Sequence, residues 1–85
     1  MGEIDLIARE GDILCFIEIK ARATAAYGPA VTAITQRQQS RVARAASLYI
    51  QQSDWSGACR FDALGLDWTG ESWAFTLLRD AFEAS

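Results

Sequence analysis

The sequence contains no histidine and only two cysteines, Cys15 and Cys59. With no histidine and no pair of closely spaced cysteines, the usual ligand sets of protein-bound zinc are excluded. Two cysteines are also too few for the disulfide framework of a small secreted domain. Cys15 lies among the apolar residues of an expected strand, and this position predicts a small buried side chain.

Long apolar runs are also missing. No apolar stretch reaches the roughly 18 residues of a membrane span, and no basic segment leads into an apolar one. We therefore expect no membrane segment and no secretory signal, and we predict a cytoplasmic protein. The 85 residues are 51% hydrophobic and include three Trp, two Tyr and four Phe. This composition predicts one folded domain over residues 1–85.

Acidic residues are absent from residues 19–53, although the whole chain has a net charge of −3. A basic segment of this kind can attract a polyanion locally despite the overall sign, so nucleic acid is an expected partner. Three of its arginines fall on one face of an expected helix, and such a stripe is either a solvated surface or a set of phosphate contacts. The basic residues of this segment are Lys20, Arg22, Arg37, Arg41 and Arg44.

Two stretches with strand-like alternation flank a tight-turn signal and predict a β-hairpin over residues 2–9 and 13–20. If the turn is a two-residue loop, counting outward from it places Asp5 opposite Glu18 on one face. Alternation within the strand puts Lys20 on that same face, whereas a slip of one residue would point Asp5 away. Two carboxylates at this distance repel each other, and a divalent cation would relieve the repulsion.

The remainder of the chain predicts a helix followed by two strands. Small residues and a Gly-Pro pair indicate a mobile connection over residues 21–33. Thr35 and Gln38 form a capping-box pattern, which predicts a helix from Gln36 to about Gln52. Further strands are expected at residues 60–68 and 72–78. The expected order, β-β-α-β-β, is that of an α/β domain.

Four side chains of the second half are open to more than one interpretation. Asp62 is either a further acidic residue of the site or a partner of Arg60 or of the sheet edge, and we favour pairing. Trp55, Trp68 and Trp73 are expected to supply core or interface area. Stacking of these rings on nucleic-acid bases would require an exposed face, which the sequence does not reveal.

Several stretches together resemble the YraN family of small bacterial proteins, which are similar to Holliday-junction resolvases. They are GEIDLIA, FIEIKAR, a Gly-Pro loop, a Gln- and Arg-rich helix start leading to AASLYI, RFDAL and a terminal DAF. Within them, Asp5, Glu18 and Lys20 have the spacing of the PD-(D/E)XK nuclease motif. The resemblance implies a restriction-endonuclease-like αβββαβ core, of which this chain lacks the first helix and strand.

The same resemblance implies roles for individual residues. Asp5, Glu18 and the carbonyl of Ile19 would bind Mg²⁺ or Mn²⁺, and Lys20 would orient or activate water and stabilise developing charge. Carboxylate-held Mg²⁺ that retains waters suits phosphodiester cleavage, as does a compact cation beside it. Gln39 would lie beside the site. The residues expected to bind nucleic acid are Arg22, Arg37, Gln39, Arg41 and Arg44.

The sequence thus predicts a nucleic-acid-binding protein with a metal-dependent, endonuclease-like phosphodiesterase site, acting on DNA in preference to RNA. The alternative is a non-catalytic binding or assembly module that retains the fold. The hairpin carries apolar residues on both faces, but the chain supplies only one confident helix to cover them. We therefore expect one face to be open, and a homodimer or a domain of marginal stability.

Overall fold

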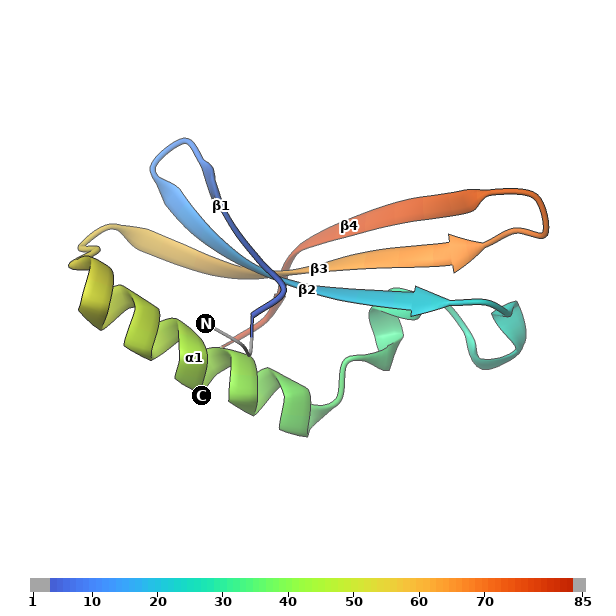
Figure 1. Ribbon diagram of the computed structural model, residues 1–85, viewed down its shortest axis with the longest axis horizontal. Coiled ribbons are helices and arrows are strands. Elements are labelled where there is room, and N and C mark those ends of the chain that lie inside the picture. The colour runs from blue at the N-terminus through green and yellow to red at the C-terminus, as the bar shows by residue number, and fades with distance from the viewer. Residues whose placement is uncertain (1–3, 84–85) are drawn as a thin grey trace.

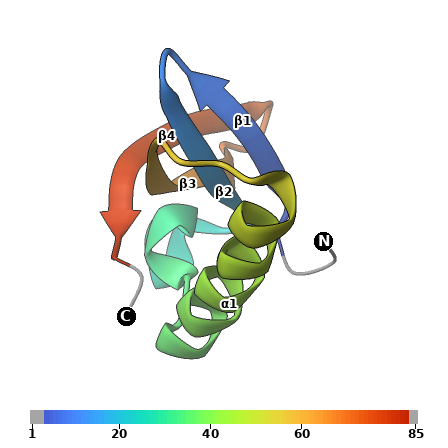
Figure 2. The same cartoon turned by 90° about the vertical axis from the view of Figure 1, so that its left-hand side faces the viewer.

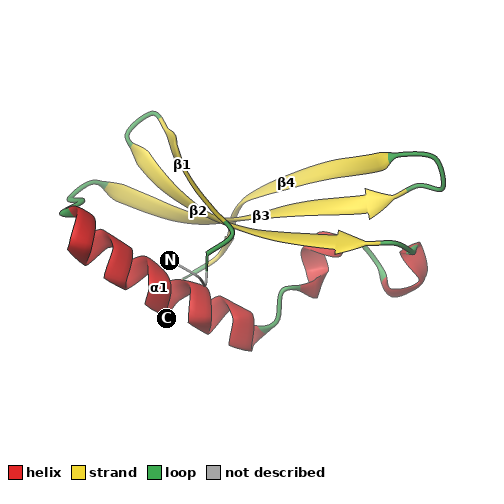
Figure 3. Ribbon diagram, viewed as in Figure 1, coloured by secondary structure: helices red, strands yellow, loops and turns green. Residues whose placement is uncertain are grey.

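The computed structural model describes residues 4–83. Its elements follow the expected order β-β-α-β-β, with two short 3₁₀ helices before the α-helix (Figures 1 and 3). Gly2 and Glu3, the expected start of the first strand, lie outside the described residues. The elements are β1 (Leu6–Glu10), β2 (Ile13–Arg22), η1 (Ala25–Tyr27), η2 (Ala30–Ala33), α1 (Gln36–Ser53), β3 (Ala58–Trp68) and β4 (Trp73–Phe82).

The four strands form one mixed sheet in the order β1-β2-β3-β4. β1 and β2 are antiparallel, β2 and β3 are parallel, and β3 and β4 are antiparallel. The parallel pair is joined through α1, because parallel neighbours require a long crossover. Glu10 pairs with Ile13 and Leu6 with Ile17, so the turn between β1 and β2 has two residues. The predicted hairpin register is confirmed.

The start of α1 is fixed by the capping box that the sequence predicts. The backbone N–H of Gln38 donates to Thr35 Oγ1 at 3.1 Å, and the Thr35 N–H donates to Gln38 Oε1 at 2.9 Å. Each side chain satisfies a backbone donor at the helix start that has no partner within the helix. The helix ends at Ser53, and Asp54 caps it with a left-handed backbone (φ 58°) and an N–H that donates to the Ile50 carbonyl.

The core lies between α1 and one face of the sheet (Figure 2). Phe16 is fully buried there, and its ring centroid is 5.6 Å from that of Phe61 on the neighbouring strand. The Tyr49 ring of α1 packs edge to face on the Phe16 ring, with 5.9 Å between their centroids. Val42 of α1 belongs to the same core and is 1% exposed. Contact between aromatic rings of β2, β3 and α1 therefore holds the helix on this face.

Among residues 4–83, the sheet face away from α1 is uncovered where β3 and β4 form it, whereas Cys15, Ile17 and Asp62 on the same face are buried (Figures 1 and 2). Pairing of Trp68 with Trp73 and of Leu66 with Phe75 places their side chains on this face, opposite to that of Phe61. The two indoles pack edge to face at 5.3 Å, and Phe75 is 72% exposed. The expectation of one open apolar face is confirmed for the part formed by β3 and β4. Its large exposed side chains are Leu6, Trp68, Trp73, Phe75 and Leu77.

The connection between β2 and α1 contains two 3₁₀ helices and contacts the sheet, where the sequence predicts a mobile segment over residues 21–33. The Ala30 N–H donates to Asp67 Oδ1 at 2.9 Å, and Ala30 is fully buried. Gly65 of β3 permits this docking, because a Cβ atom there would lie 2.7 Å from Val31 Cγ1. The small residues that resemble a linker instead allow η2 to lie directly on the sheet.

Candidate functional site

The predicted carboxylates meet at the open end of the β1–β2 hairpin. Asp5 immediately precedes β1, and extending the register beyond Leu6 and Ile17 places it opposite Glu18. Asp5 Oδ2 accepts a hydrogen bond from the backbone N–H of Ile19 at 2.9 Å. Asp5 is exposed, whereas Glu18 retains only 9% of its accessible surface. One carboxyl group is therefore buried on the α1 side, and the other reaches it from solvent.

This arrangement separates the acidities of the two carboxyl groups. Burial, together with the hydrogen bond to Asp5 and the charge of Asp5, raises the pKa of Glu18 to about 7 against the opposing charge of Lys20. The pKa of Asp5 is lowered, chiefly by a hydrogen bond from Glu18 and then by the Ile19 N–H and the Lys20 charge. The pair behaves as two carboxyls that share one proton near neutral pH. A divalent cation could take the place of that proton.

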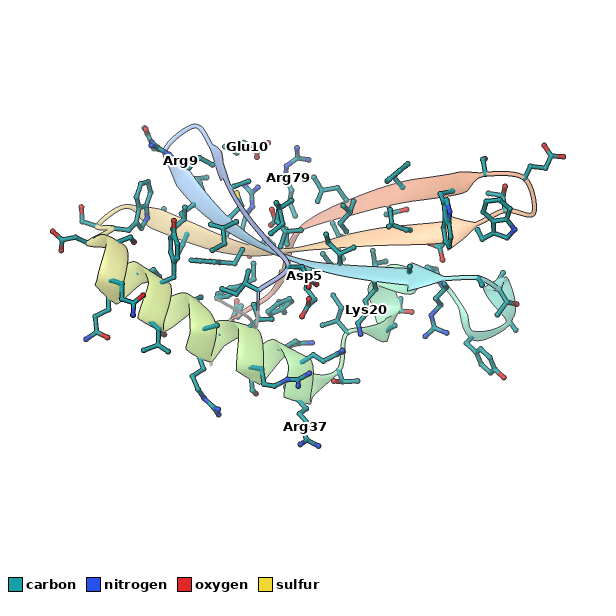
Figure 4. All side chains as sticks on the ribbon, in the orientation of Figure 1. Asp5, Arg9, Glu10, Lys20, Arg37 and Arg79 are labelled. Carbon is teal, nitrogen blue, oxygen red and sulfur yellow. The ribbon has the colours of Figure 1, made fainter. Side chains whose placement is uncertain are left out.

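Lys20 completes the predicted triad on the same face. It follows Glu18 by two positions in β2, so both side chains point toward the α1 side. Figure 4 shows Asp5 and Lys20 near each other at the middle of the sheet. Lys20 is half-buried and acts electrostatically on both carboxyl groups. A single cation thus faces the two carboxylates.

The donor set is compatible with Mg²⁺ or Mn²⁺. It would comprise the carboxylates of Asp5 and Glu18 and the backbone carbonyl of Ile19, all of them hard oxygen ligands. Among residues 4–83, no group of three or more His, Cys, Asp or Glu side chains gathers to hold a metal ion. Two carboxylates are enough for Mg²⁺, which usually keeps several of its waters. The residues present therefore fit such an ion.

The residues expected to bind nucleic acid are divided between two regions. Arg22 ends β2 on the same face as Lys20, and its guanidinium lies 5.9 Å from the ring centroid of Tyr27. Arg37 is exposed at the start of α1 and points away from the sheet (Figure 4). Gln39 Nε2 donates to the Ile34 carbonyl at 3.4 Å, so its amide binds the preceding connection. The other two arginines of the stripe, Arg41 and Arg44, are also exposed on α1.

A second polar cluster lies on the opposite face and is separate from the carboxylate pair. Arg60 Nε donates to Asp62 Oδ1 at 2.8 Å, and its Nη2 lies 3.2 Å from the buried Cys15 sulfur. Glu10 accepts hydrogen bonds from both Arg60 and Arg79. Figure 4 shows Glu10 and Arg79 near each other. Burial acts to raise the pKa of Asp62, but the Arg60 hydrogen bond, the Asp80 N–H and the charges of Arg60 and Arg79 together hold that pKa below its ordinary value. The pairing of Asp62 with Arg60 is confirmed.

Sequence reasoning found one ion pair of this cluster and missed the rest. Glu10 and Arg79 are 69 positions apart, and strand alternation alone does not bring them together. Their pairing depends on β2 and β3 lying side by side and parallel, which places β1 and β4 on either side of them. The Arg60-x-Asp62 spacing was the one local signal.

The fold and the carboxylate–lysine arrangement together are consistent with the core of a nuclease-like α/β protein. Residues 1–66 match the family described as "Uncharacterised protein family UPF0102", and the chain belongs to this family. The predicted resemblance to YraN-like proteins is thereby confirmed.

The chain is similar to UPF0102 proteins of several bacteria. It is 42% identical to that of Chromohalobacter salexigens over 98% of this chain and 68% of the relative. For the Shewanella pealeana protein the identity is 41%, over 95% of this chain and 69% of the relative. For the Herminiimonas arsenicoxydans protein it is 37%, over 98% and 64% respectively. The chain thus spans about two thirds of the length of these relatives.

Proposed function

We propose that this chain is a nucleic-acid-binding domain with a metal-dependent phosphodiesterase site of the endonuclease type. The observation that carries the proposal is the position of Asp5, which contacts the Ile19 N–H and faces the buried carboxyl of Glu18. Burying a carboxyl beside a second one is costly unless a cation or a proton is bound there. Lys20 supplies one positive charge, which balances only one of the two carboxylates, so a further cation can be bound.

The chemistry follows from the residue types. Bound Mg²⁺ or Mn²⁺ would act as a Lewis acid toward a phosphodiester. Asp5 and Glu18 provide the anionic oxygens that hold such an ion, and the Ile19 N–H fixes the orientation of the Asp5 carboxylate. Lys20 can orient a water molecule and neutralise charge that develops on the phosphate oxygens. The energetic benefit of this lysine is therefore greatest in the transition state.

The basic residues supply the contacts to the substrate backbone. Arg22 extends the line of Glu18 and Lys20 along β2, and the arginines of α1 are exposed. Such cations bind phosphates without reading sequence, so binding should be general and dependent on salt. We favour DNA over RNA as the polymer.

We also assign the protein to the cytoplasm. Both cysteines are free, including the exposed Cys59. Free thiols are typical of a reducing compartment. No helix among residues 4–83 has the length and hydropathy to cross a bilayer.

A cleavage assay tests the proposed activity. The protein is incubated with Mg²⁺ or Mn²⁺ and with duplex, single-stranded and branched DNA and RNA, and the products are separated by size. We expect cleavage by the wild type and by the control variant Asp12→Asn, which changes a remote acid. Glu18→Gln and Lys20→Ala should both be inactive. Activity that survives both substitutions would refute the site.

A second candidate function is a non-catalytic nucleic-acid-binding module. It is favoured by the small donor set, since only two carboxylates meet in the described part of the chain. This alternative predicts binding that is unchanged by Mg²⁺, and no cleavage of any polymer. The same assay, combined with a binding measurement, therefore separates the two candidates.

The open sheet face supports a further part of the proposal, that the chain forms a homodimer. Phe75 is 72% exposed and Leu77 43% exposed, and Trp68 and Trp73 lie beside them. Contiguous apolar patches of this kind are uncommon on monomers and mark association sites. A second copy offers an equally apolar face, so packing the two together would bury both patches at once.

A further inference from the structure

A cavity of about 310 Å³ lies where the η1–η2 connection meets the far end of the β3–β4 hairpin. Its volume is at the small end of the range for small-molecule sites and suits one planar ring system. Its wall is mostly apolar or backbone. The lining residues are Ala25, Gly28, Pro29, Asp67, Trp68 and Thr76.

Two polar side chains of this wall have hydrogen-bonding capacity left over. Asp67 Oδ1 accepts from the Ala30 N–H at 2.9 Å, whereas Oδ2 has no hydrogen-bond partner within residues 4–83. The hydroxyl of Thr76 likewise makes no hydrogen bond within that range. A carboxylate oxygen only accepts, so the complementary ligand must present N–H or O–H donors.

The cavity lies on the same face as the carboxylate site. Asp67 pairs with Arg22 across the parallel strands, and Arg22 follows Glu18 by four positions in β2. At a strand rise of about 3.3 Å per residue, roughly 13 Å separate these two positions. Arg22 Nε is buried without a hydrogen-bond partner, and the neighbouring Tyr27 ring is 76% exposed. A cation and an exposed aromatic ring therefore adjoin the cavity.

We propose that the cavity binds an unpaired guanine base of a nucleic-acid strand whose backbone passes the carboxylate site. This inference rests on the proposed function for its polymer. The guanine edge presents two adjacent N–H donors that can bind one carboxylate. Adenine and cytosine place an acceptor beside their amino group, and thymine and uracil flank their N–H with two carbonyls. The Asp67 carboxylate therefore favours guanine over adenine, cytosine, thymine and uracil.

The surrounding residues complete the subsite. Arg22, which pairs with Asp67 in the strand register, would contact a flanking phosphate. Tyr27 offers its exposed ring to the next base, because stacking on an aromatic ring tolerates any base. The substrate class is therefore a single-stranded or flipped-out segment with guanine near the reacting phosphate.

Titration with the four nucleoside 5′-monophosphates tests the base specificity directly. Amide signals of Ala25, Gly28 and Thr76 are followed by NMR in the presence of EDTA. We expect guanosine monophosphate to shift these signals and to bind about tenfold or more tightly than the other three. Equal affinity for the four nucleotides, or no shift of these amides at millimolar guanosine monophosphate, would overturn the assignment.

Two variants show whether the cavity itself is responsible. Asp67→Asn keeps an acceptor for the Ala30 N–H but loses the carboxylate, so the guanine preference should disappear. Asp12→Asn, in the distant hairpin turn, removes the same charge and should leave the preference intact. If Asp67→Asn perturbs the fold, Thr76→Leu provides a second test. The leucine side chain would fill the cavity and should block binding of all four nucleotides. Unchanged guanosine monophosphate binding in a folded cavity variant would overturn the proposal.

An oligonucleotide comparison separates this inference from the proposed function. An all-thymine single strand and the same strand with one central guanine are compared for affinity in EDTA, where no cleavage occurs. We expect the guanine to increase affinity about tenfold. Guanine preference without metal-dependent cleavage would support guanine binding in the cavity and refute the nuclease proposal. Cleavage without any guanine preference would support the nuclease proposal and refute guanine binding in the cavity.

Discussion

Asp5 and Glu18 face each other across the β1–β2 hairpin, and the Ile19 N–H donates to Asp5 Oδ2 at 2.9 Å. The pKa values of the two carboxyl groups are moved apart: burial and the neighbouring Asp5 raise that of Glu18 to about 7, and the hydrogen bond from Glu18 lowers that of Asp5. The main cause for Glu18 is burial, which opposes its charged form. The pair therefore carries a proton at mildly acidic pH. Above neutral pH Glu18 loses this proton, and a cation could bind in its place.

Glu18→Gln should stabilise the fold above neutral pH. Because the pKa of Glu18 is raised from 4.5 to about 7 by folding, its contribution to stability is complete below 4.5 and is lost as pH rises through about 7. The neutral glutamine avoids that loss, so we expect its Tm to exceed that of the wild type by several degrees at about pH 8. The difference should shrink toward about pH 5. Thermal melts between about pH 5 and pH 8 measure this Tm difference, and Glu71→Gln is the control. A Tm difference between Glu18→Gln and the wild type that did not depend on pH would contradict the account.

The arginine stripe of α1 predicts a salt-dependent affinity for nucleic acid. The affinity should fall with salt with a log–log slope of roughly −0.7 to −0.9 per phosphate contacted. Replacing Arg37, Arg41 and Arg44 by glutamine should flatten that slope by about two to three phosphates. Arg9→Gln is the control, because this guanidinium lies 5.1 Å from the Trp55 ring centroid at the other end of the hairpin. An unchanged slope in the triple variant would assign the stripe to solvent.

Lys20→Ala should abolish cleavage while leaving affinity for nucleic acid nearly unchanged. The reason is that this lysine faces the carboxylate pair and acts mainly on charge that develops in the transition state. Lys20→Arg should restore little activity, since a guanidinium does not replace a compact ammonium. The measurement pairs a cleavage rate with a binding constant for each variant. A collapse of affinity would make Lys20 a phosphate contact and would remove the catalytic role.

The open face predicts self-association. Sedimentation at micromolar concentration should show a dimer, and Phe75→Glu should shift it to monomer because the substitution places a charge in the apolar patch. Leu48→Glu is the matched control, as Leu48 is 49% exposed but belongs to α1. A wild-type monomer with a cooperative melt would contradict the prediction.

Local sequence signals were sufficient for the part of the site that lies on one hairpin. A two-residue turn sets the register, and period-two alternation carries it outward to Asp5 and Glu18. The capping box at Thr35 likewise set the start of α1. Both signals act over a few residues, so they do not depend on how distant segments pack.

Features that depend on distant segments were not predictable in this way. The docking of η2 on the sheet requires a residue without a side chain, Gly65, beneath Val31, and it requires Asp67 to accept a hydrogen bond from the Ala30 N–H. β4 extends to Phe82 rather than ending at residue 78. The β3–β4 register is irregular there, where Asp80 takes a left-handed conformation (φ 54°) and its N–H donates to Asp62 Oδ1.

Paramagnetic broadening by Mn²⁺ tests the central claim most directly, because it requires no knowledge of the substrate. The NMR amide signals of Asp5 and of residues 17–20 should broaden before all others as Mn²⁺ is added. The affinity should rise with pH through about 7, where Glu18 loses its proton. Glu18→Gln should weaken binding, because it removes an anionic oxygen ligand. Uniform broadening, or none at millimolar Mn²⁺, would contradict a metal site at Asp5 and Glu18.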